Sequence, residues 1–269
     1  LFARFFKGTM AEHSFRFTHA ITRKPAPSVV SGLRAEERGE PDYVRMLTHH
    51  ADYVACLTGT GAKVITLAPL DDFADSVFVE DTALCLPKGA VIMRPGAPTR
   101  LGETTEMTPH LAALYGHVET ITAPDAFIEA GDILTTEREV LIGLSARTNR
   151  QGFTQLAKII APWGYRLREV ITPKGVLHFK TDCSLLDSET ILSTKRLAAS
   201  DCFAEYRVLH TADGEEAAAN AIRFNDLVLF PAGFPKTRDM LLAHGYDVRE
   251  IGNSECAKID GGMSCLSLR

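Results

Sequence analysis

The chain has 269 residues and a formal net charge of −5, with 34 acidic and 29 basic side chains. An acidic balance without a basic run argues against nucleic-acid binding, and no apolar stretch approaches the roughly 20 residues that cross a bilayer. Its 45% of hydrophobic and 23% of charged residues are typical of a globular protein with a sizeable core.

The N-terminal stretch LFARFFKGTM is basic and apolar, but it is too short for a signal peptide. We expect Met10 to be the natural start, residues 1–13 to be an N-terminal extension, and residues 14–269 to form a single domain, since no linker divides them. Without a secretory signal the six cysteines should stay reduced, as in a cytoplasmic enzyme. No C-x-x-C pair occurs among them, so no structural zinc site is expected.

The first part of the chain predicts one helix among several strands. Pro41 is typical of a first helical turn, apolar residues follow it at helical spacing, and Gly59 and Gly61 end the helix. Strands are expected at 17–22, 64–67, 76–86 and 89–94. The third strand carries Glu80 and Asp81 in its middle, which is unusual because charged side chains are rarely buried without partners.

A unit then recurs along the chain. It consists of a helix, a strand, and a hairpin whose first strand is interrupted by polar residues. Further helices are expected at 102–115, 148–163, 198–205 and 237–245. Further strands are expected at 117–122, 128–134, 139–148, 165–172, 176–186, 191–194 and 247–251. A hairpin at 218–233 turns at Asn225 and Asp226, and a short alternating strand at 265–269 completes the pattern.

One polar residue interrupts an apolar strand in each of these units. These residues are Glu80, Glu129, His178, Asn220 and Cys265, at separations of 49, 49, 42 and 45. A spacing of this size indicates a repeated supersecondary unit, stacked radially or in a line. Because equivalent strands carry unlike reactive groups, we expect these groups to meet at one centre.

Cys265 lies in the stretch KIDGGMSCLSLR, three residues after the pair Gly261 and Gly262. The glycines allow a tight backbone path, so the thiol is expected at a strand edge beside a flexible turn. Taken alone, the cysteine is more simply interpreted as a buried structural thiol, since free cysteine packs as a small hydrophobe.

A thiol, an imidazole and several carboxylates that converge suit a nucleophilic attack with acid and base help. Acids beside a thiol would repel its thiolate unless a cation occupies the site, and a guanidinium fits because its carbon is also an electrophile. Arg94 and Arg147 could hold a carboxylate of the same substrate, which together indicates an arginine-like amino acid. Each residue alone has a structural alternative: a core histidine for His178, a cap for Glu129, and a buried ion pair of Glu80 and Asp81 with Arg94.

Seven motifs in chain order resemble those of the dimethylarginine dimethylaminohydrolase (dimethylargininase) family. They are FADSVFVEDTALC, IMRPGAPTRLGE, IEAGD, IGLSARTN, LHFKT, AAN and KIDGGMSCLS, and the similarity covers nearly the whole chain from about Phe17 onward. This family belongs to the guanidino-group-modifying superfamily, with arginine deiminase and the amidinotransferases. The resemblance implies an α/β fold, a five-bladed propeller (pentein) of five ββαβ-like repeats around a central active site.

The resemblance also implies a role for each matching position. Cys265 would be the nucleophile, His178 the general acid and base, and Glu129 the residue that orients His178 and contacts the guanidinium. Asp81 would bind the guanidinium, and the loop before Gly32 would be a lid that excludes water. The remaining positions implied for substrate binding are the α-carboxylate partners Arg94 and Arg147, the α-amino partners Asp75 and the backbone of Leu33, and the pocket-lining Glu80 and Ile259.

The implied reaction is hydrolysis of dimethyl- or monomethyl-L-arginine to L-citrulline and a methylamine, through a covalent thiouronium on Cys265. It needs no metal or organic cofactor, because thiol and imidazole supply the chemistry. The expected partner is a small-molecule substrate, with no nucleic acid and no membrane, and the protein is expected to be a monomer or a homodimer. One alternative is an arginine deiminase-like enzyme, which the lack of an inserted helical domain disfavours. The other is a non-catalytic arginine-binding protein, against which the intact Cys265, His178 and Glu129 count.

Overall fold

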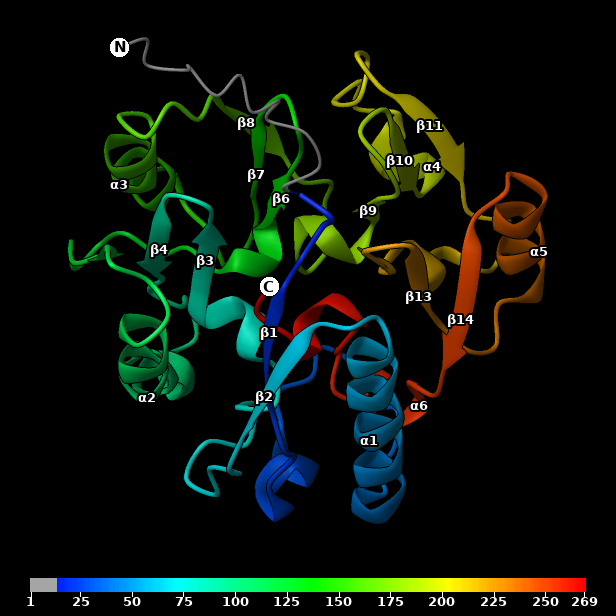
Figure 1. The fold of residues 1–269 in the computed structure, drawn as a ribbon, viewed down its shortest axis with the longest axis horizontal. Coiled ribbons are helices and arrows are strands. Elements are labelled where there is room, and N and C mark those ends of the chain that lie inside the picture. Colours follow the sequence, from blue (N-terminus) through cyan, green and yellow to red (C-terminus); the bar gives the residue numbers. More distant parts are fainter. Residues whose placement is uncertain (1–13) are drawn as a thin grey trace, which may run out of the picture.

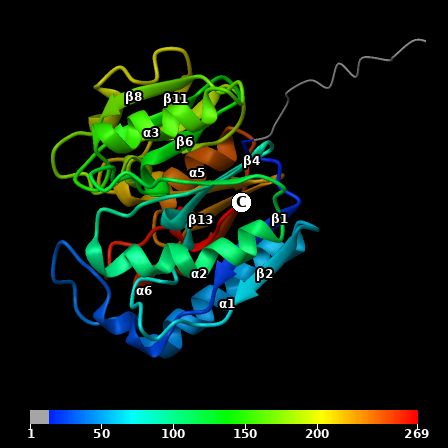
Figure 2. The same cartoon turned by 90° about the vertical axis from the view of Figure 1, so that its left-hand side faces the viewer.

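The computed structural model describes residues 14–269, so the expected N-terminal extension of residues 1–13 lies outside the described part of the chain. Five small sheets surround a central axis, which Figure 1 views end on, and the C-terminal segment in red lies at the centre. The helices lie on the outer side of the sheets, and Figure 2 shows the same arrangement from the side. None of the helices within residues 14–269 combines the length and the apolar character that a bilayer crossing requires.

Four of the sheets share one topology, an antiparallel hairpin followed by a parallel third strand. Their strands in chain order are β3 (Ala83–Leu86), β4 (Gly89–Ile92), β5 (Val118–Thr120), β6 (Ile133–Thr135), β7 (Val140–Leu144), β8 (Leu167–Ile171), β9 (Cys183–Leu185), β10 (Thr190–Ser193), β11 (Arg207–His210), β12 (Ile222–Phe224), β13 (Leu227–Pro231) and β14 (Asp247–Ile251). A parallel neighbour needs a crossover connection, and a helix supplies it in each sheet. These helices are α2 (Leu101–Ala112), α3 (Arg150–Ile160), α4 (Lys195–Ala198) and α5 (Pro235–Ala243).

The fifth sheet joins the two ends of the described chain. β1 (His19–Arg23) pairs in parallel with β2 (Lys63–Leu67), and α1 (Tyr43–Gly59) is the crossover between them. Leu268 takes the place of a hairpin strand, since Ile21 and Leu268 exchange backbone hydrogen bonds of 2.8 and 2.9 Å. The expected five-bladed α/β propeller is therefore confirmed, and each blade consists of a sheet with its helix.

Short 3-10 turns, and not strands, carry the polar residues to the axis. They are η2 (Val79–Thr82), η4 (Ala130–Asp132), η5 (Phe179–Thr181), η6 (Glu216–Ala219) and η7 (Ser264–Leu266), each just before the inner strand of its blade. The strands predicted at 76–86, 128–134, 176–186 and 265–269 are therefore wrong in their first halves. A strand would send alternate side chains of the run Glu80, Asp81 and Thr82 into the apolar core, whereas a turn has no such alternation.

α1 anchors the C-terminal segment to the rest of the fold. The helix buries one face, and the fully buried Tyr53 lies on it. The Tyr53 hydroxyl lies 2.8 Å from the hydroxyl of Ser267 and donates to the carbonyl of Met263 at 3.1 Å. These two contacts fix the backbone on both sides of Cys265.

Three short elements differ from the sequence-based expectation. α4 begins after its N-cap Thr194, whose hydroxyl accepts the N–H of Leu197, so the helix expected at 198–205 lies earlier in the chain. β11 and α6 (Ser254–Ala257) have no clear pattern in the sequence. Both are short and depend on tertiary partners, because β11 pairs with β10 and α6 packs against α1.

Candidate active site

The five turns form a ring around the axis, with neighbouring turns in contact. Between η6 and η7, the N–H of Ser264 donates to Asn220 Oδ1 over 2.8 Å. Between η7 and η2, the Ser264 hydroxyl donates to Glu80 Oε2 over 2.8 Å. Between η2 and η4, the N–H of Gly131 donates to Asp81 Oδ1 over 3.0 Å. The polar groups of different blades thus meet at one centre, and hydrogen bonds between turns hold them there.

An imidazole and a carboxylate form the innermost pair. His178 Nε2 lies 2.6 Å from Glu129 Oε2, and both side chains are buried. Burial alone would lower the pKa of His178, but the charges of Asp81 and Asp132 and the hydrogen bond with Glu129 outweigh it and raise this pKa to about 9. Burial likewise disfavours the Glu129 carboxylate, but its bond with His178 lowers the pKa of Glu129 to about 2. The pair is therefore an imidazolium and a carboxylate at neutral pH.

The thiol of Cys265 lies on turn η7, which contacts η2, and the residue is buried. The N–H of Gly262 points at its Sγ over 3.4 Å. Burial, followed by the charges of Asp81 and Glu80, raises the pKa of the thiol to about 12. A Cβ on Gly262 would lie 2.3 Å from the carboxamide of Asn220, so this close approach requires glycine. The resting thiol is therefore protonated at neutral pH.

Arg100, which the sequence reasoning missed, is the cationic partner of Asp81. Its Nη1 lies 2.5 Å from Asp81 Oδ2, its Nη2 lies 2.7 Å from Glu103 Oε2, and all three side chains are buried. The alternative ion pair of Glu80 and Asp81 with Arg94 is therefore wrong, because Glu80 pairs with Lys180 and Arg269. The spacing of Arg100 and Glu103 at the start of an amphipathic helix is the signal that could have identified it.

Arg94 is not brought into this cluster. Its guanidinium lies 5.5 Å from the ring centre of Phe127 and donates to the carbonyl of Pro124 at 3.4 Å. Arg147 is closer, because its Nη1 lies 3.4 Å from Glu129 Oε1 and its side chain is one-fifth exposed. Of the two arginines predicted to hold a carboxylate, only Arg147 lies at the edge of the buried pair of His178 and Glu129.

The two residues predicted to meet an α-amino group lie together. Leu33 donates its N–H to Asp75 Oδ1 over 3.0 Å, and burial raises the pKa of Asp75. Ile259 is buried beside them, since a Cβ on Gly32 would lie 3.0 Å from its Cδ1 and 3.1 Å from Asp75 Oδ1. These contacts form one wall between η2 and the segment that leads to Cys265.

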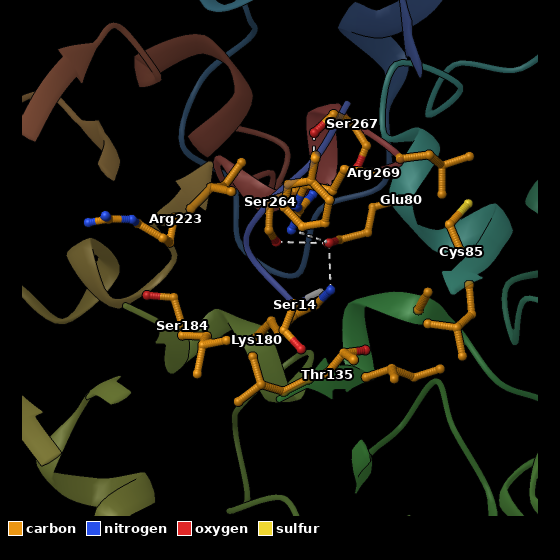
Figure 3. Close-up of a pocket in the computed structure, with 18 of the residues that line it drawn as sticks. Ser14, Glu80, Cys85, Thr135, Lys180, Ser184, Arg223, Ser264, Ser267 and Arg269 are labelled. Atoms are coloured by element: carbon orange, nitrogen blue, oxygen red, sulfur yellow. Dashed lines mark hydrogen bonds and ion pairs between the residues drawn. The ribbon is translucent and has the colours of Figure 1, made fainter. Parts of the chain in front are cut away.

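Glu80 faces the other side of the ring. Its Oε1 lies 2.5 Å from Lys180 Nζ and 3.0 Å from Arg269 Nη2. Figure 3 draws these residues among those that line a pocket. Glu80 and Ser264 line a cavity on this side, whereas their chain neighbours Asp81 and Cys265 do not line it. Glu80 therefore points into this cavity, and Lys180 and Arg269 are further polar residues of its lining that the sequence reasoning missed.

Three side chains could together hold a metal ion. Asp81, Glu129 and His178 each offer one ligand atom, and these atoms lie within 4.8 Å of one another. Each group already has a protein partner, since Glu129 pairs with His178 and Asp81 pairs with Arg100. The prediction that the chemistry needs no metal stays a prediction.

Comparisons with known proteins agree with this arrangement. The sequence model of the arginine deiminase family matches residues 45–227. The N(G),N(G)-dimethylarginine dimethylaminohydrolase of Pseudomonas aeruginosa is 40% identical over 94% of this chain and 99% of its own length. The protein of the same name from Streptomyces coelicolor is 30% identical over 93% of this chain and 96% of its own length.

A solved structure of the Pseudomonas aeruginosa enzyme, a Cys-to-Ser mutant complexed with citrulline, has a TM-score of 0.92 and covers 95% of this chain and 100% of its own. A His-to-Gly dimethylarginine dimethylaminohydrolase, an adduct with S-methyl-L-thiocitrulline, has a TM-score of 0.91 at 40% identity, covering 94% of this chain and 99% of its own. Each of these relatives and structures covers 93% or more of this chain. The chain therefore belongs to the dimethylarginine dimethylaminohydrolase family.

Proposed function

We propose that this chain hydrolyses dimethyl- or monomethyl-L-arginine to L-citrulline and a methylamine. The observation that carries the proposal is the buried His178–Glu129 pair, held in one ring of turns with Asp81 and Cys265. The relative from Pseudomonas aeruginosa bears this activity in its name, and one of its structures holds citrulline. We further propose one catalytic domain over residues 14–269 that acts in the cytoplasm as a monomer or homodimer, with neither metal nor nucleic acid as a partner. All six cysteines are free, which supports that compartment.

In the first half of the reaction, the substrate guanidinium binds beside the carboxylates of Asp81 and Glu129. Its charge offsets theirs, so the Cys265 thiol releases its proton to solvent and the thiolate forms a bond to the guanidinium carbon. The bond from this carbon to the alkylated nitrogen then breaks, and His178 gives its proton to the departing amine. A thiouronium on Cys265 remains.

In the second half, His178 is neutral and acts as a base. It takes a proton from a water molecule, which attacks the same carbon. The carbon–sulfur bond then breaks, and the proton of the new hydroxyl group passes to the departing sulfur. Citrulline leaves as the neutral urea, and Cys265 returns as a thiol. Glu129 keeps the imidazole oriented through both halves, through the 2.6 Å contact.

The α-carboxylate of the substrate is assigned to Arg147 alone, because the guanidinium of Arg94 lies against Phe127. Replacing Arg147 by alanine is expected to raise KM at least about tenfold, since a charge-assisted hydrogen bond contributes about 1.5–3 kcal/mol. Replacing Arg94 by alanine is the matched control and should change KM less than about twofold. The measurement is steady-state kinetics with dimethyl-L-arginine. An equal rise in KM in both variants would show that Arg94 also binds the carboxylate.

The Cys265 thiol is expected to resist alkylation at neutral pH in the free enzyme and to react once a cation is bound. Burial and the carboxylates of Asp81 and Glu80 raise the pKa of the thiol to about 12, and a bound guanidinium would lower it again. The measurement is the pH dependence of alkylation by a neutral reagent, with and without a non-reacting guanidinium compound that leaves the sulfur accessible. A free-enzyme thiol that already reacts as a thiolate well below pH 7 would contradict this expectation.

The substrate is tested by kcat/KM for L-arginine and its monomethyl and dimethyl forms on one preparation. The proposal predicts citrulline from the methylated forms at far higher kcat/KM than from arginine. Preference for unmethylated arginine would instead favour the arginine deiminase-like alternative, which the match to that family's sequence model supports. Tight binding of all three compounds without turnover would make the chain an arginine-binding protein.

A further inference from the structure

We propose that Asp260 is a positioning residue that latches a lid loop, residues 32–41, in its closed position over the active site. The proposal rests on the proposed function only in treating this loop as a lid. The segment before Gly32, where a lid was expected, is instead the 3-10 helix η1 (Pro27–Ser31), whose Val29 is buried in the core. The exposed segment is the one that follows, and Figure 2 shows it in blue at the lower left, beside α6 in red.

Two carboxylates hold the first part of the lid loop by its backbone. Leu33 donates its N–H to Asp75 Oδ1 over 3.0 Å, and Ala35 donates its N–H to Asp260 Oδ2 over 2.5 Å. Asp75 precedes η2, and Asp260 precedes η7, which carries Cys265. The loop therefore bridges the two walls of the proposed site, and charged acceptors hold it at both.

Arg34 makes the lid loop a single unit. Its Nη2 donates to the carbonyl of Val30 at 2.6 Å, and its Nη1 donates to the carbonyl of Gly39 at 3.2 Å. One side chain thus ties η1, just before the loop, to the end of the loop. Gly39 has a φ of +83°, which suits a sharp turn at that end. Because the loop is braced internally, loss of one outer contact should affect the whole loop.

The far end of the loop is held more firmly than its tip. Lys258 donates to the carbonyl of Glu40 at 3.1 Å, and Glu255 accepts the N–H of Asp42 at 2.8 Å. Lys258 and Glu255 also form an ion pair of 2.8 Å in which the Glu255 side chain is only 1% exposed. The Asp260–Ala35 bond, by contrast, lies at the exposed tip, so it is the contact that lid opening would break first.

The backbone of Asp260 shows what its carboxylate contributes. Its φ of +58° is in the left-handed region, where glycine would fit with less steric cost. Only the side chain of aspartate provides the bond to Ala35. Asp260 also directly precedes the two glycines whose second member, Gly262, donates to Cys265 Sγ. The latch is therefore continuous with the segment that positions the nucleophile.

Limited digestion with trypsin tests the latch on the free full-length protein, through cleavage after Arg34 and Arg38. Asp260→Gly removes the carboxylate and keeps an easy left-handed backbone, so cleavage is expected to be about three to ten times faster. Asp260→Asn retains an acceptor oxygen and should restore most of the protection. Asp201→Gly is the matched control, because Asp201 also has a φ of +58° and its exposed side chain lies outside the lid.

Peptide masses report which arginine is cut, and thermal unfolding checks that each variant is folded. Faster cleavage in Asp260→Gly, with protection in Asp260→Asn and Asp201→Gly, supports the latch. Cleavage of Asp260→Gly no faster than that of the wild type or of Asp201→Gly would overturn it. With methylated arginine, Asp260→Gly should raise KM more than it lowers kcat. The digestion needs no turnover, so it decides the latch even if no citrulline is formed.

Discussion

Replacing Cys265 by serine is expected to lower kcat for citrulline formation at least about a thousandfold, because an alcohol is a far weaker nucleophile than a thiolate. The fold should survive, since the substitution is small and the N–H of Gly262 can donate to oxygen as it does to sulfur. The measurements are kcat with dimethyl-L-arginine and Tm by thermal unfolding. We expect Tm to change by only a few degrees.

A matched control separates the chemistry from a general effect of losing a thiol. Cys56 is half-buried on α1, away from the ring of turns, and Cys56→Ser should keep kcat within about twofold of the wild type. Citrulline formation by Cys265→Ser at a rate near that of Cys56→Ser would remove the covalent mechanism.

Replacing Glu129 by glutamine is expected to lower kcat/KM about a hundredfold or more. In the pH profile of kcat/KM, the fall on the alkaline side is expected to move to lower pH. In the wild type the pKa of His178 is about 9, so the imidazole is protonated at neutral pH and loses its proton as the pH rises through that value. Glutamine keeps the size of the side chain but removes its negative charge. The protonated imidazole is then less favoured, and its pKa falls.

The pH dependence of stability gives a second measurement. In the folded protein the pKa of His178 is about 9, above its usual value of 6.5. The ion pair therefore stabilises the fold fully below about pH 6.5, and this stabilisation is lost as the pH rises through about 9. The free energy of unfolding should therefore fall less across this window in Glu129→Gln than in the wild type. Glu119→Gln is the control, since Glu119 faces His117 at 3.2 Å in an exposed pair. A fall of kcat/KM on the alkaline side at the same pH in Glu129→Gln and the wild type would show that Glu129 does not set the charge of His178.

The sequence was sufficient to predict the blades and the residues that converge. The recurring pattern of helix, strand and interrupted hairpin predicts five similar units, and Glu80, Glu129, His178, Asn220 and Cys265 all lie on or beside the central turns. Their backbone conformation was not predictable in the same way. A run that is polar at consecutive positions and apolar on both sides has neither the period of a helix nor that of a strand. Its backbone conformation depends on contacts with the neighbouring turns.

The sequence also could not predict which charged residues form ion pairs with one another at the site. Arg94 and Arg100 lie six positions apart in one motif, and only the packing of η2 shows that Arg100 pairs with Asp81. Lys180 and Arg269 reach Glu80 from blades distant in the chain. Such long-range ion pairs leave no local pattern, because each partner alone has the spacing of an ordinary charged residue.

The most direct test of the central claim, that Cys265 attacks the guanidinium-type carbon, is mass spectrometry of the protein after rapid quenching with S-methyl-L-thiocitrulline. This compound occurs as an adduct in a solved structure of the family. In His178→Gln, which lacks the base for the hydrolytic half, the peptide that contains Cys265 should gain the mass of the compound less methanethiol and keep it. The wild type should show the same gain briefly, and Cys265→Ser should show none. An adduct on a different peptide, or citrulline formation by Cys265→Ser at the wild-type rate, would contradict the account.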